Sequence, residues 1–167
     1  MIFQFGSKTK LFGDLLRRNK PFAQAILQGG EDNRSLYGKV QFYSFFEGTL
    51  VCTEVFGLPK GEGNCSEKVF GFHIHEGKSC FGTKENPFSS SGMHYNLKNC
   101  PHPLHAGDMP PLVSDGGYAW MAFYTKHFSA EEVVGRTVVI PSSPDDFKTQ
   151  PSGDSGKKIA CGVIKQV

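Results

Sequence analysis

The chain has 167 residues and a formal net charge of +2, and its lysines and arginines are scattered rather than clustered. Such a charge distribution argues against a nucleic-acid partner. No stretch approaches the ~20 apolar residues of a membrane span, which argues against a membrane partner. The start, "MIFQFGSKTKLFGDLLRRNK", has no apolar run of signal-peptide length. The sequence therefore predicts a cytoplasmic protein, or a secreted or periplasmic one if a targeting segment has been trimmed away.

The chain changes character near residue 21. Residues 1–20 form a basic N-terminal extension with a short amphipathic helix expected over 10–20, and residues 21–167 form one domain. Four strand-like runs follow, separated by clusters of Gly, Asn, Asp and Glu: "PFAQAILQG", "LYGKVQFYSF", "TLVCTEVFGLP" and "KVFGFHIHEG". In the second run Val40 and Phe42 share one face, as alternation on a strand requires. This spacing predicts an antiparallel sandwich or barrel.

Two histidines at the end of the fourth run suggest a metal. His73 and His75 are separated by one residue, so on a strand both imidazoles project from the same face. The pair alone is a weak signal, because histidines also occur at polar barrel mouths. In the metal motif of the cupins a glutamate follows three or four residues after the second histidine. Ser79 and Cys80 or their immediate neighbours occupy those places here and Glu76 is too close, which weakens the cupin interpretation.

Few strand-forming residues lie in the segment 77–117, which is rich in possible ligands. It contains "SSSGMHYNLKNCPHPLHAGDMPP", with His94, His102, His105 and Asp108. A structureless loop of this length within a domain is uncommon and is usually functional. Three imidazole nitrogens and one carboxylate oxygen complete a tetrahedral zinc shell and leave no position for a substrate water. Solvated loop histidines are the alternative, but the set predicts a structural zinc site that orders the loop.

Strands resume at "GYAWMAFYTK" and "GRTVVIP", and the polar loop "SSPDDFKTQPSGDSGKK" leads to the last strand, "IACGVIKQ". The five cysteines lack the close spacing of a zinc ribbon or a thioredoxin site: Cys52, Cys65, Cys80, Cys100 and Cys161. Their odd number leaves at least one thiol free unless another chain supplies a partner. The absence of a signal segment favours reduced thiols.

Several of these motifs, in order, resemble those of the copper/zinc superoxide dismutase family. "GFHIHEG" resembles the first signature of that family and "GMHYN" its bridging-histidine segment. "GRTVVI" resembles the strand before its electrostatic loop, and "GKKIACGVI" its second signature. The similarity spans roughly residues 21–167. It implies an all-β fold, an eight-stranded Greek-key β-barrel of immunoglobulin-like sandwich type with two long functional loops.

The resemblance also implies a site with two metals. The implied copper ligands are His73, His75 and His94, and His94 would be shared with zinc as a bridging imidazolate. The implied zinc ligands agree with the spacing argument: His94, His102, His105 and Asp108. Asp145 matches the carboxylate that links a copper ligand to a zinc ligand by hydrogen bonds. Cys80 and Cys161 match the intrasubunit disulfide of the family, for which a pair of reduced thiols is the alternative.

Two positions depart from the family pattern. Pro141 stands where the fourth copper ligand, a histidine, is expected, and His127 belongs to an earlier loop that we expect to be exposed. Lys158 replaces the arginine that guides superoxide, so the charge is kept while the planar fork is lost. Cu(II) prefers four or five ligands whereas Cu(I) accepts three or two, so three imidazoles should hold copper weakly. They could equally hold zinc with a water.

Three hypotheses follow for function. The first is a superoxide dismutase that uses a three-histidine copper site and acts on superoxide. The second, which the proline favours, is a non-catalytic or feeble member with an intact zinc site and an incomplete copper site. The third is a protein-interaction or copper-handling role. A homodimer and a monomer both fit the family.

Overall fold

Short strands joined by long loops make up the chain, as the abundance of glycine and proline predicts. A computed structural model of the protein describes residues 13–14, 16, 19–64 and 66–167. The expected helix over residues 10–20 lies largely outside the described residues. The strands are β1 (Ala23–Gly29), β2 (Tyr37–Phe45), β3 (Gly48–Phe56), β4 (Lys68–Phe70), β5 (His73–His75), β6 (Leu112–Ser114), β7 (Ala119–Thr125), β8 (Thr137–Pro141) and β9 (Lys158–Gln166). Two short 3-10 turns are η1 (Glu31–Asn33) and η2 (Ser89–Ser91).

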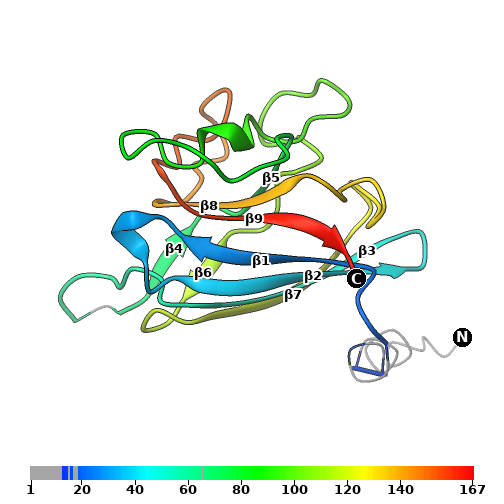
Figure 1. Ribbon diagram of the computed structural model, residues 1–167, viewed down its shortest axis with the longest axis horizontal. Coiled ribbons are helices and arrows are strands. Elements are labelled where there is room, and N and C mark those ends of the chain that lie inside the picture. The colour runs from blue at the N-terminus through cyan, green and yellow to red at the C-terminus, as the bar shows by residue number, and fades with distance from the viewer. Residues whose placement is uncertain (1–12, 15, 17–18, 65) are drawn as a thin grey trace, which may run out of the picture.

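Seven strands form one curled antiparallel sheet in the order β5-β8-β9-β1-β2-β3-β7 (Figure 1). The remaining two, β4 and β6, pair with each other in a small second sheet. Strands distant in sequence are neighbours, since β9 lies between β8 and β1, and β7 lies beside β3. The predicted all-β Greek-key fold is confirmed. Within the described residues no helix has the length and apolar character needed to cross a membrane.

The described residues contain nine strands, and the placement of some of them differs in two details from what the sequence predicted. The run "KVFGFHIHEG", expected as one strand, is split into β4 and β5, and β6 lies within a segment expected to have little strand. The break occurs at Gly71, where an added Cβ would lie 2.6 Å from Cγ of Pro141 and 2.9 Å from Cε1 of His73. Before Gly71 the chain pairs with β6 as strand β4, and after it the chain pairs with β8 as strand β5. The break thus places the two histidines on the edge strand of the large sheet.

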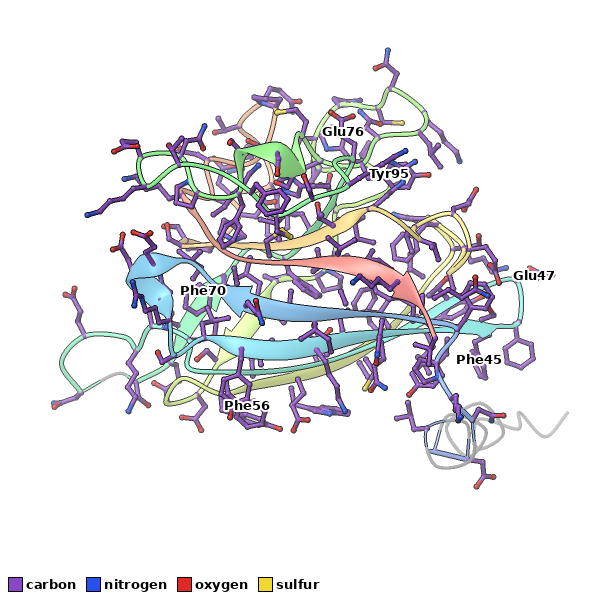
Figure 2. All side chains as sticks on the ribbon, in the orientation of Figure 1. Phe45, Glu47, Phe56, Phe70, Glu76 and Tyr95 are labelled. Carbon is purple, nitrogen blue, oxygen red and sulfur yellow. A yellow bond between two sulfur atoms is a disulfide. The ribbon has the colours of Figure 1, made fainter. Side chains whose placement is uncertain are left out.

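The core lies between the curled sheet and the β4-β6 pair. Val40 and Phe42 are fully buried, as their shared face predicts. Phe70 of β4 and Phe72, which precedes β5, are also fully buried within this core, and Figure 2 labels Phe70 there. Burying a large apolar side chain contributes roughly 1.5–3 kcal/mol. The histidine-bearing strand β5 is therefore anchored by a packed interior.

Two long loops cover the β5 end of the large sheet. The loop between β5 and β6 and the loop between β8 and β9 lie together at the top of the view in Figure 1. Glu76 and Tyr95 belong to this layer (Figure 2). Backbone hydrogen bonds attach the first loop to β5, from Tyr95 N to Ile74 O at 2.8 Å and from Ile74 N to Gly107 O at 2.9 Å. The protein itself thus supplies part of the order that the sequence had ascribed to a metal.

Candidate metal centre

Two groups of ligand-type side chains lie side by side in this loop layer and share His94. Within each group, one nitrogen or oxygen atom per residue lies within 4.8 Å of those of the others. The first group consists of His94, His102, His105 and Asp108. The second consists of His73, His75 and His94. The structure therefore brings together all the metal ligands that the sequence predicted, from β5 and from one loop.

The first group has the donors of a zinc site. Nδ1 of His94 lies 2.8 Å from Oδ1 of Asp108, and Nδ1 of His102 and of His105 each lie 3.2 Å from Oδ2. Among the described residues, these buried Nδ1 atoms of His102 and His105 have no hydrogen-bond partner. Burial alone raises the pKa of Asp108, but hydrogen bonds from His94 and from the His105 backbone lower it overall. The Nδ1 atoms of His102 and His105, which face this carboxylate without a hydrogen bond, are suitable ligands for a cation such as Zn²⁺.

The second group directs three imidazoles toward one cavity. His75 donates from Nδ1 to the carbonyl oxygen of Gly92 at 2.9 Å, which leaves Nε2 free to ligate. His73 donates from Nε2 to Oδ2 of Asp145 at 2.8 Å, which leaves Nδ1. Burial lowers the pKa of His73 and lowers that of His75 well below its ordinary value. Both rings are therefore neutral ligands at neutral pH, as copper or zinc requires.

Asp145 connects the two groups. Its two oxygens lie 2.8 Å from Nε2 of His73 and 2.8 Å from Nε2 of His102. Burial raises the pKa of this carboxyl, yet hydrogen bonds from His73, from the Phe147 backbone and from His102 bring it down to about 2. The carboxylate therefore stays ionised and fixes the tautomers of two rings that belong to different groups.

Gly153 leaves the space that this carboxylate occupies, and sequence reasoning missed it. An added Cβ would lie 2.1 Å from Oδ1 of Asp145 and 2.8 Å from Nε2 of His102. The backbone there has φ +74°, in the left-handed region that favours glycine. Nothing in "QPSGDSG" distinguishes this glycine from an ordinary loop glycine, because the close approach arises only in the folded chain.

A cavity of about 100 Å³ adjoins the three imidazoles. Pro141, buried at the end of β8, contributes to its wall and offers no ligand atom. His127 is exposed, as expected, and is not among the residues that line the cavity. Met93 and Lys158 also line the cavity. Among the described residues that line the cavity, three carry imidazoles: His73, His75 and His94.

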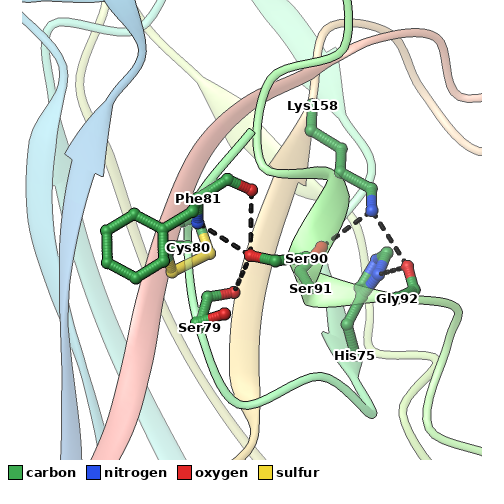
Figure 3. The surroundings of a disulfide bond; sticks show 9 residues. His75, Ser79, Cys80, Phe81, Ser90, Ser91, Gly92 and Lys158 are labelled. Carbon is green, nitrogen blue, oxygen red and sulfur yellow. Dashed lines mark hydrogen bonds between the residues drawn. A yellow bond between two sulfur atoms is a disulfide. The ribbon is translucent and has the colours of Figure 1, made fainter. Parts of the chain in front are cut away.

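Lys158 is held by two hydrogen bonds beside His75 (Figure 3). Its Nζ donates to Oγ of Ser91 at 2.7 Å and to the carbonyl oxygen of Gly92 at 2.9 Å. Burial lowers the pKa of this ammonium group. Because the Gly92 carbonyl accepts from both Lys158 and His75, the lysine also supports the orientation of a metal-type ligand. Sequence reasoning missed Ser91, whose fully buried hydroxyl has no distinguishing signal in the run "SSSG".

Comparison with known proteins assigns this arrangement to a family. A sequence model described as copper/zinc superoxide dismutase matches residues 36–164, more than half of the chain. The chain belongs to the copper/zinc superoxide dismutase family. It is 31% identical over 172 residues to copper/zinc superoxide dismutase 2 of Aquifex aeolicus, covering 93% of this chain and 96% of the relative. The enzyme of Deinococcus radiodurans is 32% identical over 138 residues, covering 72% of each chain.

A solved structure supports the same fold. The copper/zinc superoxide dismutase from Brucella abortus superposes with a TM-score of 0.70 at 24% identity, covering 84% of this chain and 98% of that chain. The disulfide expected from the family resemblance is present, joining Cys80 and Cys161 with their Cα atoms 5.7 Å apart. Cys52 and Cys100 are free, and Cys65 lies outside the described residues. The bond ties the first loop of this superoxide dismutase fold to β9.

Proposed function

We propose that this member of the superoxide dismutase family is a zinc protein with an incomplete copper site and slow or absent superoxide dismutation. Zinc is assigned to His94, His102, His105 and Asp108. Weakly held copper is assigned to His73, His75 and His94. The single observation that carries the proposal is the proline ring of Pro141 in the wall of the copper-type cavity.

The residues of the zinc group act as a structural unit. Asp108 and three imidazoles would supply all four ligands, so no position is left for a substrate. Asp145 supports the group by accepting a hydrogen bond from Nε2 of His102 at 2.8 Å. Zinc binding would therefore contribute to folding of the loop rather than to chemistry.

The residues of the copper group can bind copper but are poorly suited to cycling it. Copper, when bound, would supply the one-electron chemistry that dismutation of superoxide needs. His73 and His75 are fixed by hydrogen bonds to Asp145 and to Gly92 at 2.8 and 2.9 Å. With Pro141 in place of a fourth imidazole, the tetragonal shell that Cu(II) prefers is not completed by these residues. The oxidised state is then disfavoured, which slows any cycle that must return to it.

A functional superoxide dismutase is the second candidate. Lys158 lines the same cavity as the three imidazoles and keeps a positive charge there. A cavity of about 100 Å³ is large enough for a small anion such as superoxide. This ammonium group could guide the anion, although two of its donor positions are engaged by Ser91 and Gly92.

Metal analysis and a dismutase assay on the zinc- and copper-loaded protein test the proposal. We expect one zinc per chain, less than full copper after dialysis, and turnover far below the diffusional ceiling of roughly 10⁸–10⁹ M⁻¹s⁻¹. Pro141→His should raise copper retention and turnover, whereas Pro141→Ala, which removes the ring without adding a ligand, should not. Full copper occupancy with near-diffusional turnover of the unmodified protein would refute the proposal. Equal retention in both variants would refute the missing-ligand explanation.

A further inference from the structure

Among the residues that line the copper-type cavity, Met93 is a further one whose side chain carries a metal-binding atom, the sulfur of a thioether. Met93 lines the cavity together with His73, His75 and His94. A hydrogen bond from Glu76 N to Met93 O at 2.9 Å holds the backbone of Met93. The next residue, His94, is buried and also restrains it. The side chain of Met93 is 48% exposed and therefore not committed to the packed core. An unbranched methionine side chain with three rotatable bonds can move within such a space.

The charge in this cavity favours a monovalent cation. No carboxylate belongs to the described residues that line it, and its titratable groups are three imidazoles and the ammonium of Lys158. That ammonium is held in place by Ser91 and Gly92 at 2.7 and 2.9 Å. Coulomb repulsion between it and a bound ion doubles when the ion carries two charges instead of one. Two acids contact imidazoles of the cavity wall from outside it: Asp145 is engaged by His73 and His102, and Asp108 by His94, each at 2.8 Å.

The chemistry of the donor atoms also favours a monovalent copper ion. Thioether sulfur and imidazole nitrogen suit the soft ion Cu(I), whereas Cu(II) requires four or five ligands in a tetragonal arrangement. Pro141 and Val139 line the wall with apolar atoms, so they provide no fourth nitrogen or oxygen for Cu(II). A d¹⁰ ion such as Cu(I) has no need of that geometry.

We propose that the copper-type site selects Cu(I) over Cu(II), with the sulfur of Met93 joining the imidazoles as a ligand. The inference rests on the proposed function, which assigns copper to this site, and it adds the oxidation state and a ligand. Copper bound at this site would favour its reduced form, which accounts for slow dismutation.

Copper affinity in each oxidation state tests the proposal, using the full zinc-loaded chain with its disulfide intact. Cu(I) affinity is measured anaerobically by competition with bicinchoninate, and Cu(II) affinity by competition with nitrilotriacetate. Met93→Leu should weaken Cu(I) binding about tenfold, the low end of what support residues of metal sites contribute, and leave Cu(II) binding unchanged. Met121→Leu is the matched control, because Met121 packs against the core instead of the cavity, and it should alter neither affinity.

X-ray absorption provides a readout that is independent of activity. In selenomethionine-labelled protein loaded with Cu(I), the selenium edge should show a copper neighbour that disappears in Met93→Leu and persists in Met121→Leu. A copper spectrum with nitrogen ligands alone, or Cu(II) bound more tightly than Cu(I), would overturn this inference even if dismutation is slow. Failure of either ion to bind would overturn both this inference and the copper assignment. Rapid turnover with a selenium–copper contact would overturn only the proposed slow dismutation.

Discussion

Removal of the Cys80–Cys161 disulfide should destabilise the metal-free protein by several kcal/mol. The bond joins residues separated by 81 positions. In the chain-entropy treatment, closing a loop of this length in the unfolded state corresponds to about 4.5 kcal/mol at 25 °C, near the upper end of measured effects. The folded loop keeps its backbone bonds to β5 through Tyr95 and Gly107 in either redox state, so most of the change is expected in the unfolded chain.

Urea denaturation of the double variant Cys80→Ser/Cys161→Ser measures this effect, with EDTA present so that metal binding adds nothing. With a slope of about 2 kcal/mol/M, a loss of about 4 kcal/mol lowers the midpoint by about 2 M. Cys52→Ser is the control, since Cys52 is free and only half-buried on β3. Alkylation and mass analysis of the wild type establish that the bond has formed. A double variant with the same midpoint and slope as Cys52→Ser would refute the loop-closure reasoning.

Three further predictions concern the metal groups. Asp145→Asn should weaken metal binding about 10–100-fold, because the hydrogen bonds that orient His73 and His102 are impaired; chelator competition measures this. Zinc at a hundred times its dissociation constant should raise the free energy of unfolding of the wild type by about 2.7 kcal/mol, and that of Asp108→Ala by much less. Calorimetry with and without zinc measures both values. An equal increase in the two proteins would exclude Asp108 as a ligand. Gly153→Ala should lower zinc affinity because its Cβ would lie 2.1 Å from Oδ1 of Asp145, and an unchanged affinity would contradict the close-approach argument.

The spacing of apolar residues and turn residues predicted most of the strands, because strand formation depends on residues a few positions apart. The strand-like runs correspond to β1, β2, β3, β7, β8 and β9, since alternation and turn residues act over a few positions. Val40 and Phe42 are buried for the same reason. The split between β4 and β5 was not predictable, because it depends on the contact of Gly71 with Pro141, 70 positions away.

The sequence predicted the ligand residues of the candidate site but not the residues that position them. Histidine and aspartate have chemistry that is visible in the sequence, and the family motifs single out Asp145 and Lys158. Gly153 and Ser91 have no such signal. Gly153 leaves space for Asp145 and His102, and Ser91 accepts a hydrogen bond from Lys158, so each acts on a residue of a distant segment. Met93 is similarly inconspicuous, since a methionine beside a histidine is usually just an apolar neighbour. Only the folded chain places Met93 among the residues that line the cavity.

The two metal groups depend on different segments, which explains how the chain can depart from the family pattern in one of them alone. All four zinc-type ligands lie within residues 94–108, and the loop that carries them is attached to β5 by its own backbone bonds. The copper-type group instead combines β5 and His94, and Pro141 at the end of β8 lines the same cavity. The zinc-type ligands lie on a different segment from Pro141. Asp145 joins the two groups, so one carboxylate orients both His73 and His102.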